Sequence, residues 1–307
     1  EKGGKVNLVV KDTDITNDYT GTFNLTDYDA EVDRTRRDRY GIMDAVNSGS
    51  CSSKFVTYVT QSAGSTGTFT AESTAKTESN PVWAEVSEEV KKIASYVKVS
   101  KEMLEDLSFI RSEINNDLIA GLTESIETAL LNGSGIGANI NGLLSIPMGL
   151  PAFTGAGFTG VNAIQDANLS DVLRVAKAQI EASNYTPTYV ILNPIDVAKL
   201  HLTKDATGNY TYPMYIPESG QMIVADMTVI SSSFMAQDSY LVGDMSRVNV
   251  KMREGLNLSV GLDQDDFTRN MVTILAEARL VQYVKTNQKT AFVTGTISTD
   301  IAVIDAP

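Results

Sequence analysis

Three aspartates lie within four consecutive positions and offer carboxylates that could bind a hard cation. They are Asp263, Asp265 and Asp266. Calcium takes oxygen ligands, so closely spaced acidic residues are suitable donors. The spacing nevertheless lacks the central glycine and the final glutamate of a calcium loop. The sequence therefore predicts no metal ion, and these three residues are the candidate ligands if one binds.

The sequence lacks the side chains that a zinc site or a catalytic triad requires. His201 is the only histidine and Cys51 is the only cysteine. Zinc sites use several His, Cys or carboxylate ligands, and a Ser-His-Asp or Cys-His site needs a histidine beside its nucleophile. His201 lies in the run 199–202, which is typical of a helix end. We expect no enzyme active site and no cofactor. Cys51 cannot form a disulfide within the chain, which fits a reducing compartment.

A glycine-rich run at residues 131–137 invites comparison with a phosphate-binding loop. Phosphate loops follow a strand, open a helix and carry a Lys-Ser or Lys-Thr pair. This run closes a helical pattern and has no such pair. We interpret its first glycine as the end of a helix.

Composition excludes several classes of partner. The chain of 307 residues is 42% hydrophobic and 21% charged, and 25 basic against 38 acidic residues give a formal net charge of −13. High affinity for duplex DNA or an anionic membrane requires clustered Lys and Arg. No apolar run is long enough to cross a bilayer. We expect neither sequence-specific DNA binding nor membrane binding.

The most informative element is a strand-type stretch, residues 92–99, that runs directly into a long amphipathic helix. Apolar residues then recur in steps of three and four, which keeps one stripe on a single side of the helix. These residues are Met103, Leu107, Ile110, Ile114, Leu118, Leu122, Ile126 and Leu130. About thirty residues at roughly 1.5 Å each make a rod some 45 Å long. Such a rod suits a long, thin subunit, like a tile in a wall.

The first eighty residues contain little apolar material. Residues 1–47 are polar and without sustained periodicity, so we expect them to be disordered or laid across another surface. Residues 54–60 are strand-like, residues 64–67 form a turn, and residues 68–72 are the expected return strand. A two-stranded hairpin is marginal in water unless something packs on it. Another subunit is the simplest candidate.

The remaining sequence is mixed α/β. We expect a helix capped at Ser170, a buried strand at 188–194, and a short helix that begins with Pro194. Further strands are expected at 222–225 and 240–243. Residues 271–285 form one long strand or strand pair that could lie beside the strand preceding the rod.

Taken in order, these parts resemble the major capsid proteins of tailed bacteriophages, with the Hong Kong 97 type of fold. The likeness covers nearly the whole chain and depends on the succession of several segments. They are residues 55–60, 71–79, 90–106, 130–135, 192–196, 241–244 and 267–279.

The resemblance implies an α+β subunit built from five consecutive parts. They are an N-terminal arm at 1–47, an extended hairpin loop at 48–81, a peripheral domain with its spine helix at 82–135, an axial domain at 136–265, and return strands with a C-terminal tail at 266–307. It also implies a precursor whose N-terminal segment is often removed, which would explain a start at Glu1.

The resemblance further implies partners and a location. Copies of the chain would assemble in the bacterial host cytoplasm as hexamers and pentamers, forming the shell of a virion around double-stranded DNA. Portal, scaffold, maturation protease, decoration and head-closure proteins would be further partners. The expected role is structural, not enzymatic.

The type member of this fold joins its subunits through a Lys–Asn isopeptide bond assisted by a glutamate. Asn270 and Glu277 match that motif in position and spacing, and Lys54 and Lys76 are the candidate lysines. A free lysine is protonated at neutral pH, so a desolvated glutamate would have to take its proton before attack on the amide. The alternative is that Glu277 pairs with Arg279 and Asn270 caps a turn.

Two other functions stay open. An encapsulin, the cellular compartment protein that shares this fold, would enclose cargo proteins and normally lacks an arm like residues 1–47. A secreted hydrolase or surface-binding protein would be a stable monomer with a ligand pocket.

Overall fold

The computed structural model describes residues 41–305, except residues 66, 107, 205–207 and 211–221. The predicted arm, residues 1–47, therefore lies mostly outside the described residues. Within the described part, no helix has the length and apolar character needed to span a membrane. The chain divides into two compact units, whose described residues are 94–122 with 256–277 (unit 1), and 41–93 with 123–255 and 278–305 (unit 2).

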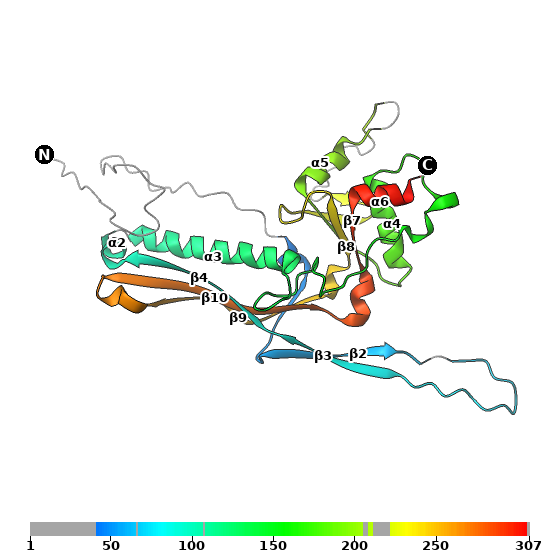
Figure 1. The fold of residues 1–307 in the computed structure, drawn as a ribbon, viewed down its shortest axis with the longest axis horizontal. Coiled ribbons are helices and arrows are strands. Elements are labelled where there is room, and N and C mark those ends of the chain that lie inside the picture. Colours follow the sequence, from blue (N-terminus) through cyan, green and yellow to red (C-terminus); the bar gives the residue numbers. More distant parts are fainter. Residues whose placement is uncertain (1–40, 66, 107, 205–207, 211–221, 306–307) are drawn as a thin grey trace. The chain divides into compact units, whose positions relative to one another are not determined.

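A four-stranded sheet brings together segments that are far apart in the sequence. Its order is β1 (Asn47–Ser50), β9 (Val248–Gly261), β10 (Met271–Val284) and β4 (Lys91–Ser100) (Figure 1). The predicted neighbourhood of residues 271–285 and the strand before the rod is confirmed, because β10 is adjacent to β4. The fourteen-residue strand β9 was not predicted.

The predicted strand-to-rod transition is present. Strand β4 leads into α2 (Lys101–Asp106) and then α3 (Ser108–Asn132). Four residues of the predicted stripe are buried, namely Leu118, Leu122, Ile126 and Leu130. Helix α3 ends before Gly133, as expected. A Cβ at that position would lie 2.5 Å from the carbonyl oxygens of Ala129 and Ile140, so close backbone approach requires the glycine.

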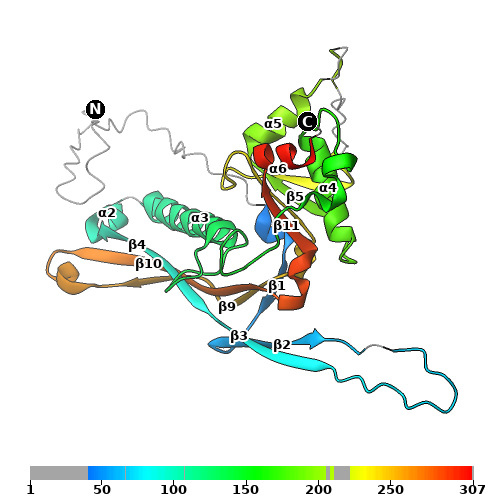
Figure 2. The same cartoon turned by 45° about the vertical axis from the view of Figure 1, so that its right-hand side comes forward.

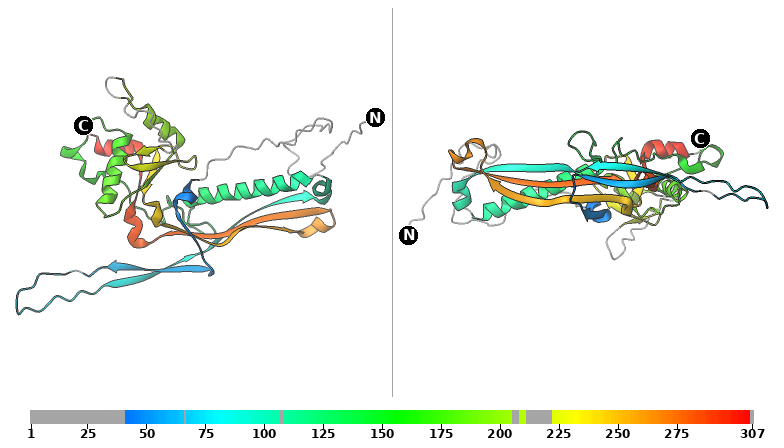
Figure 3. Two further views of the ribbon diagram at one scale, coloured as in Figure 1. Left: turned by 180° about the vertical axis from the view of Figure 1, so that it is seen from behind. Right: turned by 90° about the horizontal axis from the view of Figure 1, so that it is seen from below.

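The predicted hairpin exists, but its return strand was wrong. Strand β2 (Phe55–Ala63) pairs antiparallel with β3 (Val82–Glu89), side by side in Figure 3, and not with residues 68–72. The reason is packing. One face of the pair buries Tyr58 against Val281 and Tyr283, and the Tyr58 and Tyr283 rings stack 5.0 Å apart. Residues 68–72 are exposed and do not belong to this cluster.

Unit 2 also contains a five-stranded sheet, in the order β11 (Phe292–Thr296), β8 (Ser239–Gly243), β5 (Tyr189–Leu192), β7 (Met227–Ser231) and β6 (Ile223–Val224). The strands predicted at 188–194 and 240–243 are present, but β5 ends at Leu192 because Asn193 already caps the helix that follows. Residues 222–225 contain only the two-residue β6. The central strands are buried on both faces.

The helices of this unit are α4 (Leu169–Glu181), α5 (Pro194–Leu202) and α6 (Ile297–Ile304). Helix α4 is capped by Asn168, not Ser170, and Asn193 caps α5, where Pro194 occupies the first turn as predicted. Helices α4 and α6 are neighbours and share one apolar core with the sheet (Figure 2). The range 266–307 was predicted to hold the return strands of the peripheral domain and a C-terminal tail. Within this range, β11 pairs with β8 and α6 joins the core shared with α4.

The start of the described chain is a short helix, α1 (Ile42–Ala45), followed by β1. Strand β1 pairs in parallel with the beginning of β9, where Asn47 lies opposite Asn249. Cys51 follows β1, and its N–H donates to the carbonyl of Met252 at 3.0 Å.

Candidate functional site

The predicted acidic cluster is organised around a lysine. In unit 1, Lys98 Nζ lies 3.1 Å from Asp263 Oδ2 and 3.1 Å from Asp266 Oδ1. Asp265 points to a different cation, Arg269, at 3.6 Å. Among the described residues, no group of three His, Cys, Asp or Glu side chains could hold a metal ion. The ammonium group of Lys98 therefore balances the two carboxylates that were candidate metal ligands.

Asp266 is the centre of this cluster. It is buried and accepts hydrogen bonds from the Thr273 hydroxyl at 2.6 Å and the Asp263 N–H at 2.8 Å. The Thr273 hydroxyl, together with the Asp263 N–H and Lys98, holds the pKa of Asp266 below its ordinary value. The two carboxylates raise the pKa of Lys98. The cluster fixes the turn between β9 and β10 to β4.

The two candidate lysines of the crosslinking motif have different surroundings. Lys54 precedes β2, and its Nζ lies 3.0 Å from Glu89 Oε1 and 5.3 Å from the Phe55 ring centroid. The hydrogen bonds that Glu89 accepts from the ammonium groups of Lys91 and Lys54 lower the pKa of its carboxyl group. Lys76 is exposed, in the stretch that joins β2 to β3.

Asn270 and Glu277 both belong to unit 1, but one copy of the chain does not bring them together. Asn270 directly precedes β10, is exposed, and has a left-handed backbone with φ of 55°. Its carbonyl accepts the Lys101 N–H at 2.8 Å. Glu277 is half-buried within β10. Seven residues at about 3.3 Å each separate the two by roughly 23 Å along the strand.

Two further residues named from the sequence, Arg279 and His201, lie in ordinary secondary structure. Arg279, the expected partner of Glu277, has its Nε 3.2 Å from Glu254 Oε2 on β9. His201 lies in the last turn of α5, as predicted for a helix-end histidine.

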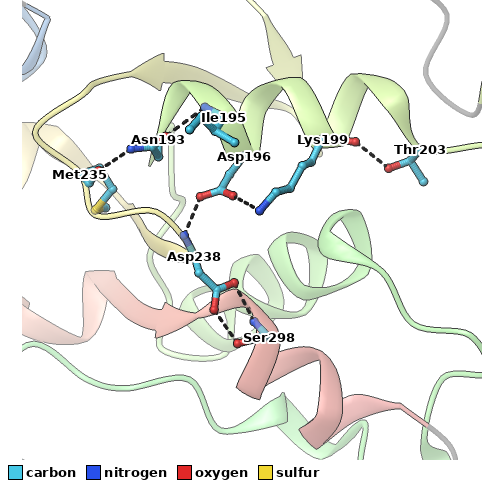
Figure 4. A network of polar contacts seen from close by, with 8 residues as sticks. All are labelled: Asn193, Ile195, Asp196, Lys199, Thr203, Met235, Asp238 and Ser298. Atoms are coloured by element: carbon cyan, nitrogen blue, oxygen red, sulfur yellow. Dashed lines mark hydrogen bonds and ion pairs between the residues drawn. The ribbon is translucent and has the colours of Figure 1, made fainter.

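Sequence reasoning missed a polar network in unit 2, drawn in Figure 4. Asp196 on α5 is 0% exposed, and its carboxylate accepts the Asp238 N–H at 2.7 Å and the Lys199 ammonium at 2.8 Å. Asp238 in turn accepts from the N–H and hydroxyl of Ser298. Asp196 carries a local signal, since it lies in the first turn of a helix capped by Asn193. Nothing in the local sequence indicates its partner, forty-two positions away.

Comparison with known proteins agrees with this architecture. The family model described as "Phage capsid family" matches residues 25–294. The major capsid protein of Enterobacteria phage HK97 is 31% identical over 266 residues, which are 85% of this chain and 66% of that protein. The chain thus spans slightly less than two thirds of the length of that curated relative.

Solved structures show the same fold. A chain from Microbacterium phage Oxtober96 has a TM-score of 0.70 at 16% identity, covering 88% of this chain and 95% of that one. A capsid of a native GTA particle has a TM-score of 0.67 at 14% identity, with the same coverage. A chain from Mycobacterium phage Adephagia has a TM-score of 0.66 at 14% identity, covering 85% and 91%. With an α+β fold of the Hong Kong 97 type and a family match over most of its length, the chain belongs to the phage capsid family.

Proposed function

We propose that this chain is the major capsid protein of a tailed bacteriophage and assembles with itself into the icosahedral head shell around double-stranded DNA. The observation that carries the proposal is the family match over residues 25–294. The architecture supports it, because the chain combines a long helix and long sheet strands with a two-stranded hairpin.

The hairpin supplies a surface that a neighbouring copy would cover. Alternate residues of a strand face opposite sides. One side of the β2–β3 pair is packed through Tyr58, whereas Phe55 (51% exposed), Val59 (62%) and Trp83 (62%) belong to the other side. An open apolar face on a two-stranded sheet is costly in a monomer. In a shell of hexamers and pentamers, a second copy would bury it.

Charge supports enclosure of DNA without sequence recognition. The formal net charge of −13 disfavours tight contact between the chain and DNA phosphates. The remaining parts of this proposal rest on the family resemblance. They are the location in a virion assembled in the host cytoplasm, the partners (portal, scaffold, maturation protease, decoration and head-closure proteins), and the domain ranges 1–47, 48–81, 82–135, 136–265 and 266–307.

Covalent joining of subunits through Lys76, Asn270 and Glu277 is a finer proposal within this function. Glu277 would take a proton from the Lys76 ammonium, the amine would attack the side-chain amide carbon of Asn270, and the C–N bond of that amide would break, with its nitrogen leaving as ammonia. Both lysines are exposed, but Lys54 is engaged by Glu89, so Lys76 is the better candidate lysine. The separation of roughly 23 Å along β10 means that a glutamate would have to assist an asparagine of another copy. The linkage would therefore form only in an assembled shell.

The test is assembly of the full chain and of a variant with a charged hairpin face. We expect the purified chain to form closed particles in negative-stain microscopy, and Trp83→Glu to reduce them strongly while leaving the circular dichroism spectrum unchanged. Ile146→Glu, at a position that is 95% exposed, is the matched control and should still assemble. A single 33.1 kDa species under all conditions would overturn the proposal in favour of a monomeric hydrolase or surface-binding protein. Native particles that hold cargo protein and no genome would favour an encapsulin.

A further inference from the structure

Helix α6 lies beyond residue 294, where the family match ends. We propose that α6 is a clasp that closes the core around the five-stranded sheet. Asp238, which we call the catch, accepts hydrogen bonds from the N-terminus of α6. The buried Asp196 on α5 holds Asp238 in position.

The N-terminus of α6 is capped from a distant part of the chain. The first N–H groups of a helix lack partners within the helix. Within the described residues, Thr296, which directly precedes α6, makes no side-chain capping hydrogen bond. The Ile297 N–H instead donates to the Asp238 carbonyl at 2.8 Å, and the Ser298 N–H donates to Asp238 Oδ1 at 3.1 Å. The Ser298 hydroxyl donates to the other carboxylate oxygen, Oδ2.

Asp238 can do this only in a specific backbone conformation. Its φ is 67°, in the left-handed region that residues with a Cβ rarely adopt. Two contacts from the α5 side stabilise this conformation (Figure 4). The Asp238 N–H donates to the carboxylate of Asp196 at 2.7 Å, and the Asn193 amide donates to the Met235 carbonyl at 2.8 Å.

Asp196 is suited to this positioning role. A buried carboxylate is costly unless it is hydrogen-bonded and paired. One oxygen of Asp196 takes the Asp238 N–H and the other takes Lys199 Nζ at 2.8 Å, although Lys199 is itself about half exposed. These two bonds fix the orientation of the Asp196 carboxylate toward the N–H of Asp238.

The rest of α6 is fastened to other segments. The Tyr240 hydroxyl donates to Asp300 Oδ2 at 2.8 Å, and the Ile164 N–H donates to the Ile304 carbonyl at 2.7 Å. Ile297 and Ile304 are buried in the core shared with α4. Helix α6 is thus held by three separate parts of unit 2, namely the loop before β8, strand β8 and the segment before α4, and loss of the Asp238 contacts would release the first of them.

This arrangement predicts that a change on α5 weakens a helix about one hundred residues later in the chain. Removal of the Asp196 carboxylate leaves the Asp238 N–H without its acceptor and frees the left-handed residue to relax. The cap of α6 is then lost. Within the described residues, the Asp196 carboxylate bonds to Asp238 and Lys199, and Asp238 links it to α6.

Hydrogen exchange followed by mass spectrometry on the full chain tests the clasp. In Asp196→Ala and Asp238→Ala, we expect the amides of residues 297–304 to exchange about ten- to a hundredfold faster, the effect of losing a charge-assisted hydrogen bond. Amides of α4 should keep their protection. Glu72→Ala, which removes an exposed carboxylate in the stretch between β2 and β3, is the control and should leave α6 unchanged.

Unchanged exchange of residues 297–304 in Asp196→Ala overturns the proposal. If α4 also loses protection in that variant, Asp196→Leu decides, because leucine has about the size of the aspartate side chain and offers no acceptor to the Asp238 N–H. Selective exposure of α6 in Asp196→Leu supports the clasp, and uniform exposure of unit 2 or unchanged α6 overturns it. The measurement uses separate protomers, so its outcome is independent of shell assembly.

Discussion

Glu127 on α3 accepts a hydrogen bond from the Ile42 N–H at 3.2 Å through Oε2, and it also accepts the Met43 N–H at 3.0 Å through Oε1. Glu127 is 1% exposed and Ile42 is 1% exposed. One buried carboxylate thus satisfies the first N–H groups of α1, the element at which the described chain begins. This contact ties the end of the arm to the helix.

Glu127→Ala removes the acceptor and leaves both N–H groups without it. We expect a loss of about 2–4 kcal/mol in the free energy of unfolding, since an orphaned buried donor costs about 1–3 kcal/mol and the Met43 N–H is only part-buried. Urea denaturation followed by circular dichroism measures this loss. Glu124→Ala, one turn earlier and half-buried, is the control and should cost much less. Equal losses in the two variants would contradict the anchoring role of Glu127.

The acidic turn at 263–266 should respond to pH in the manner of a stabilised carboxylate. The pKa of Asp266 is lowered, mainly by the Thr273 hydroxyl. A lowered folded pKa gives stability that is present above the unfolded value of about 3.9 and is lost as the pH falls through the folded value. In an NMR titration of the carboxyl carbon, we expect the pKa of Asp266 to rise in Thr273→Val and in Lys98→Met. A pKa of Asp266 that stays the same in both variants would contradict this account.

The predictions from the sequence were most successful where apolar residues recur at a regular spacing. The stripe from Leu118 to Leu130 follows from helical spacing alone, and its burial is confirmed. The strand before it and the buried strand at β5 carry equally clear apolar patterns. The return strand of the hairpin failed because residues 68–72 and Val82–Glu89 have similar β-type composition. Only the latter can place Val86 in the cluster with Tyr58 and Tyr283, a contact between segments about two hundred residues apart.

The candidate sites show the same limit. Asp263 and Asp266 are close in sequence, so their cluster was predicted, but the lysine between them comes from β4, more than 160 residues earlier. The Asp196–Asp238 contact has no local signature. The topology of the fold decides which distant polar residues meet. Hydrophobic periodicity predicts single helices and strands, but it does not predict how they are arranged.

Asp300 should give the opposite pH response to Asp266. Burial raises the pKa of Asp300, whose Oδ2 accepts the Tyr240 hydroxyl at 2.8 Å. A raised folded pKa gives stability that is full below the unfolded value of about 3.9 and is lost as the pH rises through the folded value. Asp300→Asn keeps an acceptor for Tyr240 and carries no charge. We therefore expect the melting temperature of the variant, relative to the unchanged chain, to rise between pH 4 and pH 7.

Differential scanning calorimetry at several pH values measures this difference. Asp305→Asn is the control, because Asp305 is exposed at the end of α6, where its carboxylate accepts the Ala167 N–H at 3.0 Å. Parallel melting curves of the unchanged chain and Asp300→Asn at every pH would contradict a buried, charge-sensitive Asp300.

Gly295 should tolerate no side chain, because the Asp300–Tyr240 pair occupies the space beside it. A Cβ at this position would lie 1.9 Å from Asp300 Oδ2 and 2.6 Å from the Tyr240 hydroxyl. Its φ is outside the left-handed region, so the constraint is steric. We expect Gly295→Ala to lower the free energy of unfolding by about 1–3 kcal/mol, the usual range for overpacking. Urea denaturation measures this loss. Gly255→Ala, where a Cβ meets nothing within 4 Å, is the control and should change it little.

Covalent joining of subunits has a simple readout in denaturing gels of assembled particles. If the linkage forms, the unchanged chain should give a ladder of multiples of 33.1 kDa. Lys76→Ala and Asn270→Ala should abolish the ladder, because they remove the amine and the amide that react. Glu277→Gln should slow its appearance at least tenfold, as expected for loss of a general base. Lys54→Ala is the matched control and should keep the ladder, since Lys54 is bound to Glu89. A ladder that disappears in Lys54→Ala and persists in Lys76→Ala would reverse the assignment, and a single monomer band from intact particles would exclude the linkage.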